Sequence, residues 1–392
     1  MSAATAPAAA RKLQIRPLVA GCLIGLAIGW NIANVGPVAS LLAHHYGVSL
    51  AVVGVFTTVL FFAELAVMFP GGWAIDQYGA KRAGLVAIAV SLLANAALML
   101  PISAVPALAF RLVAGVGVGL GFLAGAIYAQ SSARAPEAQA LAGGIYGGSS
   151  LGGGGVALVV VPQLVSPFGW RAPYLSGVVV AALCIPFVLA APATPGHGGS
   201  AERPRIAALM ADEQLARLGA ISTVSFGISV ILGNWVVTLL ERHNGFDAGR
   251  AGAIGSLILL MGIVGRPAGG ILVRAHPHLT RPILAASFLA GSLGTVVLFV
   301  APGTAGDVAA AAVIGAAAGI PFGFTIAAAT RAWPHAAGAA VGAMNIYPVL
   351  AIVCGAPLVG LTFSLTGRGR IGFAAVAALW SGAILVLRGL DI

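Results

Sequence analysis

Three charged side chains lie well inside long apolar runs of the sequence, namely Glu64, Arg111 and Arg266. A charge at such a depth is costly unless it is paired or hydrated. A buried guanidinium can bind an anion through two parallel hydrogen bonds. A buried carboxyl group can carry a proton, because apolar surroundings disfavour its charged form. These residue types therefore indicate anion binding and proton transfer.

Each of the three also has a structural explanation. Arg111 could hold carbonyl groups of a neighbouring helix, and we favour a structural or coupling role for it over direct contact with a solute. Glu64 could form a static ion pair with Arg111 or Arg266, which would keep it ionised. Arg266 could pair between helices and hold a cytoplasmic gate. The residue types alone leave these alternatives open.

The composition excludes a soluble domain. Of the 392 residues, 59% are hydrophobic and 8% are charged, and the mean hydropathy is +1.02. Soluble domains carry roughly 25% charged residues. The net charge of +10 comes from basic residues scattered over loops, so we expect a lipid bilayer and no nucleic acid as partner. Placing the amino terminus in the cytoplasm puts most loop Lys and Arg residues on that side, and both termini are then cytoplasmic.

Long apolar runs, rather than alternating ten-residue segments, predict an all-α integral membrane protein. No A-x-A cleavage site follows Met1–Arg16, so we expect the first apolar segment to remain as a spanning helix. Twelve transmembrane helices are predicted. They cover about 17–43, 50–71, 83–101, 105–129, 140–164, 171–191, 217–241, 250–272, 281–301, 306–330, 338–363 and 371–389.

The two sets of six helices repeat one another. A Pro-, Gly- and Ser-rich charged stretch at 192–216 separates them and reads as a cytoplasmic linker. We therefore predict two pseudo-symmetric six-helix bundles, at 1–191 and 217–392. Glycines support the duplication, because those of the fourth predicted helix recur about 198 residues later in the tenth. The pairs are Gly117 with Gly315, Gly121 with Gly319, and Gly125 with Gly323.

These glycine rows allow two helices to approach closely. In a protein whose halves rock against each other, such faces could act as gates, and the run Gly152–Gly155 is a further candidate. Static tight packing is the alternative explanation.

The loop after the second predicted helix contains Gly72, Asp76, Gly79, Lys81 and Arg82 in the pattern G-x-x-x-D-x-x-G-x-[KR]-[KR]. The two glycines are expected to let the backbone turn. The aspartate could meet a helix amino terminus or an arginine in one conformation only. The two basic residues would hold the loop in the cytoplasm. This pattern resembles the loop signature of the major facilitator superfamily.

The resemblance implies a twelve-helix secondary transporter and roles for both buried arginines. Arg111 opens a segment similar to the superfamily motif R-x-x-x-G-x-G, whose arginine is associated with proton coupling or with ordering of the bundle. Arg266 lies in a segment that resembles the helix-8 arginine motif of the nitrate/nitrite porter branch. That branch has a second arginine in helix 2, which this chain lacks; at the repeat offset, the helix-2 counterpart of Arg266 is Met68. Val35-Gly36-Pro37 and the Gly152–Gly155 run are similar to the cyanate transporter branch.

In this superfamily the first and seventh helices line the central cavity. Polar and aromatic side chains there, with a few on the fifth and eleventh helices, are therefore expected to face the solute, although each could equally be a packing residue. With Arg266, the expected solute-binding residues are Trp30, Asn31, Asn34, Tyr146, Asn234, Trp235, Asn345 and Tyr347. The expected coupling and gating residues are Glu64, Asp76, Lys81, Arg82 and Arg111.

No enzymatic, metal or cofactor function is expected. The sequence has no Walker loop. Cys22, Cys184 and Cys354 lack metal-ligand spacing, and His276 and His278 have no acidic neighbours.

The sequence therefore predicts a monomeric transporter in the cell inner membrane that moves a small polar or anionic solute by alternating access, with protons as a candidate coupling ion. The alternative within transport is proton-driven export of amphipathic drugs or metabolites. The fifth helix lacks the G-P dipeptide of many such exporters, and the first helix lacks their embedded acid. An alternative of another class is a membrane sensor that binds a solute without moving it.

Overall fold

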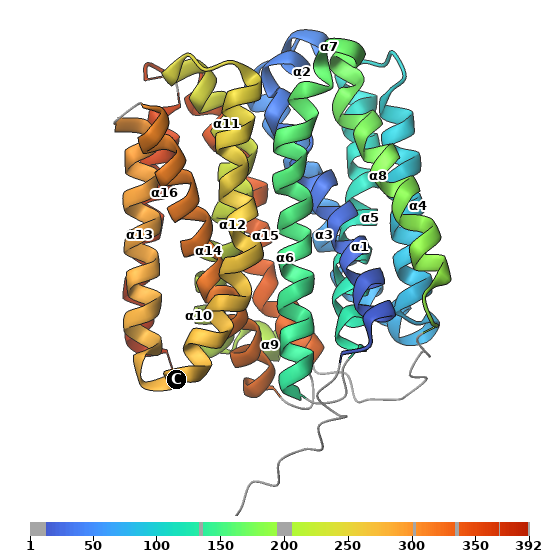
Figure 1. The fold of residues 1–392 in the computed structure, drawn as a ribbon, viewed down its shortest axis with the longest axis vertical. Helices are drawn as coiled ribbons and strands as arrows, with labels where there is room; N and C mark the ends of the chain where they lie inside the picture. Colours follow the sequence, from blue (N-terminus) through green and yellow to red (C-terminus); the bar gives the residue numbers. More distant parts are fainter. Residues whose placement is uncertain are drawn as a thin grey trace, which may run out of the picture.

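The computed structural model describes residues 13–132, 136–193, 206–300, 303–333, 337–367 and 369–390. Within these ranges the chain is helical, and twelve helices are long and apolar enough to cross a membrane. The all-α prediction with twelve spans is thereby confirmed. Figure 1 shows the helices side by side, with the first set of six coloured blue to green and the second set yellow to red. We refer to these sets as the N-half and the C-half.

The N-half consists of α1 (Ile15–Ala33), η2 (Gly36–Val38), α2 (Ala39–Tyr46), α3 (Leu50–Tyr78), α4 (Ala80–Leu98), α5 (Ala104–Gln130), α6 (Pro136–Gln163), α7 (Val165–Phe168), η3 (Gly169–Arg171) and α8 (Ala172–Ala190). The C-half consists of α9 (Ile206–Met210), α10 (Glu213–Ser222), η4 (Thr223–Gly227), α11 (Ile228–Asn244), α12 (Ala248–Ala275), η5 (Pro277–Leu279), α13 (Thr280–Val300), α14 (Thr304–Ala332), α15 (Ala337–Thr362), α16 (Arg370–Val386) and η7 (Leu387–Gly389).

The first span is interrupted near its far end, which hydropathy did not predict. It runs over Ile15–Tyr46, but α1 ends at Ala33 and a 3₁₀ turn occupies Gly36–Val38. Pro37 stands at the start of this turn and cannot donate a helical hydrogen bond. A Cβ atom on Gly36 would lie only 2.8 Å from both the Cα and the carbonyl oxygen of Asn234. The glycine thus lets the tip of the first span contact α11 of the other half.

The motif at the end of α3 differs from its prediction in one respect. Gly79 has φ of 85° and forms the turn into α4, as expected. Gly72, in contrast, lies inside α3, which continues to Tyr78, so the expectation of a turn at Gly72 was wrong. The next helix, α4, starts directly after Gly79, because this single residue forms the whole turn between the two helices. The side chain of Asp76 lies outside the described part.

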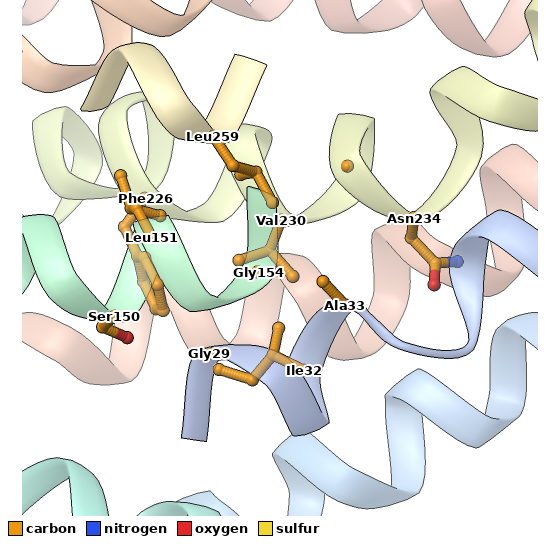
Figure 2. A pocket seen from close by; sticks show the side chains of 11 residues that line it. Gly29, Ile32, Ala33, Ser150, Leu151, Gly154, Phe226, Val230, Asn234 and Leu259 are labelled. Carbon is orange, nitrogen blue, oxygen red and sulfur yellow. The ribbon is translucent and has the colours of Figure 1, made fainter. Parts of the chain in front are cut away.

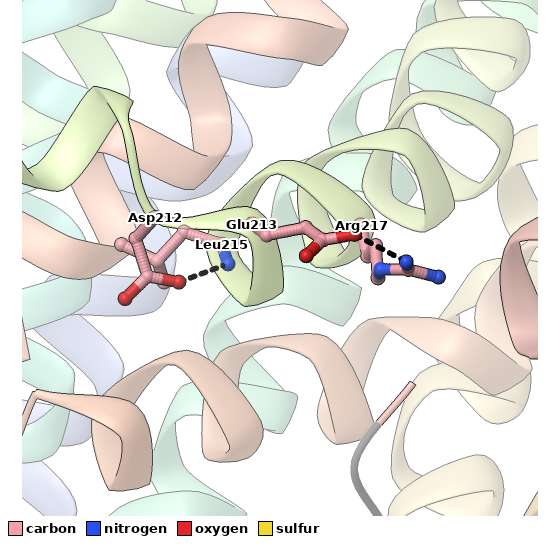
Figure 3. Close-up of polar contacts among 4 residues, drawn as sticks. All are labelled: Asp212, Glu213, Leu215 and Arg217. Carbon is pink, nitrogen blue, oxygen red and sulfur yellow. Dashed lines mark hydrogen bonds and ion pairs between the residues drawn. The ribbon is translucent and has the colours of Figure 1, made fainter. Parts of the chain in front are cut away.

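The first span of the C-half begins at Glu213, four residues before the predicted position. Asp212 caps the helix, since its carboxylate accepts a hydrogen bond from the Leu215 amide at 2.9 Å (Figure 3). The other carboxylate oxygen accepts from the Trp333 indole at 2.8 Å. Residues 194–205 of the predicted linker lie outside the described ranges, so the linker and the exact limits of the two bundles stay predictions.

The two halves meet mainly along two helix pairs, α3 with α15 and α6 with α12. We call this surface the seam. Glycines allow close approach across it and within each half. Gly155 on α6 packs against Leu260 on α12, and Gly319 on α14 lies 2.7 Å from Gly265 on α12, measured from its ideal Cβ position. The predicted glycine rows are therefore contact positions, whereas their role in gating stays a prediction; the surroundings of Gly323 lie outside the described part.

Gly153 provides a test of this packing, because a Cβ there would overlap the Leu26 carbonyl of α1. Gly153→Ala is expected to destabilise the protein by about 1–3 kcal/mol, as over-packing does elsewhere, and to lower the melting temperature in detergent. Gly382→Ala is the matched control, since nothing lies within 4 Å of that Cβ position and alanine favours the helix. Equal melting temperatures for the two variants would contradict this description.

Candidate functional site

Arg266 places a positive charge at the seam. Arg266 is 3% exposed, and its Nη1 donates a hydrogen bond to the Gly147 carbonyl of α6 at 2.8 Å. The guanidinium carbon lies 3.6 Å from the centre of the Phe322 ring on α14. The Nε has no hydrogen-bond partner among the described residues. One buried cation thus connects the C-half to the N-half and retains an unused donor.

No carboxylate neutralises this charge in the described part of the chain. An ion pair found there joins Arg217 and Glu213 within α10, which Figure 3 shows next to the Asp212 cap. The Gly147 carbonyl dipole and the Phe322 ring offset only part of the cost of burying a cation. An anion that binds at the guanidinium would offset the rest.

Glu64 lies on α3 and is buried, and its Oε2 has no hydrogen-bond partner among the described side chains and backbone. Gly119 of α5 packs against it, since a Cβ on that glycine would lie 2.8 Å from the Glu64 Cα. The structure does not contain the static ion pair with Arg111 or Arg266 that the sequence left open. The role of proton carrier stays a prediction.

Tyr146 lies near both buried charged side chains. It lies within electrostatic range of both Glu64 and Arg266, and it precedes Gly147, whose carbonyl the arginine binds. Its hydroxyl donates to the Phe122 carbonyl at 2.8 Å. The structure therefore brings three of the predicted site residues into one region of the seam.

A small cavity lies between the halves next to this region (Figure 2). Its volume is about 20 Å³, which is room for about one water molecule. Its lining comes from α1, α6, the start of α11 with η4, and α12. The lining residues are Gly29, Ile32, Ala33, Ser150, Leu151, Gly154, Phe226, Val230, Gly233, Asn234 and Leu259.

On α6 and on α12, the residues that line the cavity lie on the same helix face as the Arg266 contact. Ser150 and Leu151 on α6 lie three and four residues beyond Gly147, so they share its face. Leu259 on α12 lies seven residues, about two turns, before Arg266. The Gly147 carbonyl group that Arg266 binds therefore lies about one turn of α6 before the cavity residues Ser150 and Leu151.

The two solute-binding candidates on α11 lie in different surroundings. Asn234 lines the cavity; its Oδ1 accepts a hydrogen bond from Thr57 of α3 at 2.9 Å, and its Nδ2 has no partner among the described groups. Trp235 is fully buried, donates from its indole to the Ala356 carbonyl at 2.7 Å, and packs against Gly54 and Gly360. Asn234 is therefore at the cavity, whereas Trp235 packs between α3 and α15.

The first-helix candidates make hydrogen bonds inside the N-half in this structure. The Trp30 indole donates to Ser176 at 3.0 Å, and the Asn34 amide donates to the Pro173 carbonyl at 2.9 Å. Arg111, fully buried, donates to the Asn31 carbonyl at 3.1 Å and to the Asn34 Oδ1 at 3.4 Å. These contacts support the structural explanation for Arg111. Contact of these residues with a solute stays a prediction.

The remaining candidates lie apart from the cavity lining. Asn345 is buried on α15, and the Tyr347 ring packs against Gly219 of α10. Lys81 donates to the carbonyls of Leu189 and Ala191 at 2.8 and 2.6 Å, at the end of α8. Arg82 is exposed. Their roles in solute binding and gating stay predictions.

Aromatic residues of the seam were missed by the sequence analysis. Phe226 lines the cavity from a π-helical turn, η4, a feature that is rare and often found at functional sites. Its ring centre lies 6.4 Å from that of Phe61 on α3 and 6.3 Å from that of Phe122 on α5. An aromatic residue in an apolar run gives no signal of its own. The only local sequence signal of the π-helical turn is the pair of hydroxyl residues Thr223 and Ser225. Their side chains donate hydrogen bonds to backbone carbonyl groups, and such bonds can perturb a helix.

Two six-helix halves that enclose a cavity and a buried cation have the architecture of a secondary transporter. A family model described as Major Facilitator Superfamily matches residues 21–356 of the chain. The chain belongs to this superfamily and is a multi-pass membrane transporter of a small-molecule solute. A search among curated proteins finds no match.

Arg111 provides a test of the division between structural and solute-facing residues. Arg111→Ala removes hydrogen bonds to Asn31 and Asn34 and leaves a cavity, so a loss of about 2–4 kcal/mol of stability is expected. The melting temperature in detergent measures this loss, with the exposed Arg16 replaced by alanine as the control. An unchanged melting temperature with weakened solute binding would place Arg111 at the solute instead.

Proposed function

We propose that this transporter moves a small anionic solute across the membrane by alternating access, with Arg266 as the partner of the anion. The observation that carries the proposal is the burial of this guanidinium at the seam without a carboxylate partner among the described residues. An anion would complete its hydrogen bonding at Nε and offset its desolvation.

The position of Arg266 also supports a link between binding and movement. Its hydrogen bond to Gly147 joins α12 to α6, so a solute that competes for the guanidinium would weaken a contact between the halves. The cavity of about 20 Å³ is too small for a solute of several atoms. Solute entry therefore requires the halves to separate on one side, which is the motion that alternating access supplies.

Proton coupling through Glu64 is part of the same proposal. A buried carboxyl group without a hydrogen bond at Oε2 is suited to exchange a proton with each cycle, which would make the protein a symporter. We further propose a monomer in the cell inner membrane with both termini in the cytoplasm, supported by the distribution of loop Lys and Arg residues.

Replacement of Arg266 tests the proposal. Arg266→Ala is expected to weaken binding of a transported anion about 10-fold to 100-fold, because a buried charged hydrogen bond contributes about 1.5–3 kcal/mol. Arg266→Lys keeps the charge without the planar donor pair and should retain an intermediate affinity. Anion-induced changes in melting temperature and flux of labelled nitrate, acetate, butyrate and succinate into proteoliposomes give the two measurements.

Equal anion affinity in the wild-type protein and in Arg266→Ala would refute the assignment of Arg266. Flux of amphipathic drugs with no anion flux would favour the export alternative. Anion binding without any flux would favour a sensor.

A further inference from the structure

The surroundings of Arg266 restrict how an anion can approach it. The Phe322 ring covers the guanidinium from 3.6 Å, which occupies one of its faces. Nη1 is engaged by the Gly147 carbonyl. The unpartnered Nε lies on the edge of the guanidinium plane. An anion must therefore approach in that plane, where a flat carboxylate can accept two parallel hydrogen bonds.

The same surroundings offer a single positive charge. The other buried arginine, Arg111, directs its hydrogen bonds to Asn31 and Asn34 inside the N-half. The described lining of the cavity contains no Lys, Arg or His. A second negative charge on the solute would thus be buried without a partner, which is costly. The arrangement favours a monoanion over a dianion.

The cavity supplies an apolar environment about one turn of α6 from the carbonyl group that Arg266 binds. Its wall includes the apolar side chains of Ile32, Leu151, Phe226, Val230 and Leu259, and Ser150 and Asn234 are its only polar side chains in the described lining. A fully polar anion such as nitrate would gain nothing from these walls. An anion with a short hydrocarbon chain would bury that chain against them.

We propose that the solute is a short-chain monocarboxylate, whose carboxylate pairs with Arg266 and whose hydrocarbon chain packs against the apolar walls of this cavity, between α1, α6, α11 and α12, once the halves have separated and the cavity has widened. This inference rests on the proposed transport of an anion. It adds the class of the solute and assigns chain-length selection to the cavity walls.

The two sides of the cavity wall offer a matched pair of variants. Leu259→Ala removes side-chain volume from the wall. Gly233→Ala adds a methyl group whose nearest neighbour is the flexible end of Leu259, at 3.3 Å, so the helix can accept it. Gly382→Ala, where nothing lies within 4 Å, is the control away from the site.

The experiment measures affinity for acetate, propionate, butyrate and hexanoate with purified full-length protein, from the concentration dependence of the melting temperature. Nitrate, succinate and the neutral amide propionamide are included. Proteoliposome flux of each labelled compound is measured in parallel.

In the wild-type protein each added methylene that fits should improve affinity about fourfold, up to an optimum length. Nitrate, succinate and propionamide should bind at least about tenfold more weakly than the optimum acid. Leu259→Ala should move the optimum to a longer chain, Gly233→Ala should move it to a shorter chain, and Gly382→Ala should leave it unchanged.

The outcomes separate this inference from the proposed function. If nitrate or succinate binds as well as the best monocarboxylate and depends on Arg266, anion transport stands and the monocarboxylate assignment is refuted. An optimum length that is identical in both wall variants also refutes it. If none of these anions binds or is transported, the proposed function itself fails.

Discussion

The contact of Arg266 with the Gly147 carbonyl and the Phe322 ring holds a positive charge at the seam between the two halves. A cation in such a place is tolerated only if dipoles, aromatic faces or an anion replace the water that it has lost. Because the arginine belongs to one half and the carbonyl to the other, the charge also links the halves to each other. In the proposed mechanism, solute recognition and the relative position of the two halves therefore depend on the same side chain.

Small residues make this arrangement possible. Glycines such as Gly155 and Gly319 let helices approach until backbone and side chain touch directly, and in a bilayer this close packing replaces the hydrophobic driving force that soluble proteins use. The cavity that remains holds about one water molecule. Where the seam packs through glycines, fewer side chains have to move when the halves separate. Tight closure and reversible opening are thus compatible.

Hydropathy predicted the twelve spans and the buried arginines, because the cost of charge in hydrocarbon is visible in the sequence. It did not predict the 3₁₀ turn at Gly36 or the π-helical turn that carries Phe226. Nor did it predict which asparagine side chains face the cavity. Asn234 lines it, whereas the side chains of Asn31 and Asn34 donate hydrogen bonds to carbonyl groups of the N-half. Lipid and protein interior are equally apolar, so an apolar helix carries little sequence signal of its rotation. The family assignment supports the scaffold and leaves these details to the structure.

The most direct test of the account is to locate the solute itself. A structure of the protein with 3-bromopropionate would show the carboxylate by its density and the bromine by its anomalous scattering. The account predicts the carboxylate about 2.7–2.9 Å from the Arg266 guanidinium, with the bromine among the cavity residues Leu151, Val230 and Leu259. A bromine site elsewhere, with Arg266 free of any anion, would contradict it.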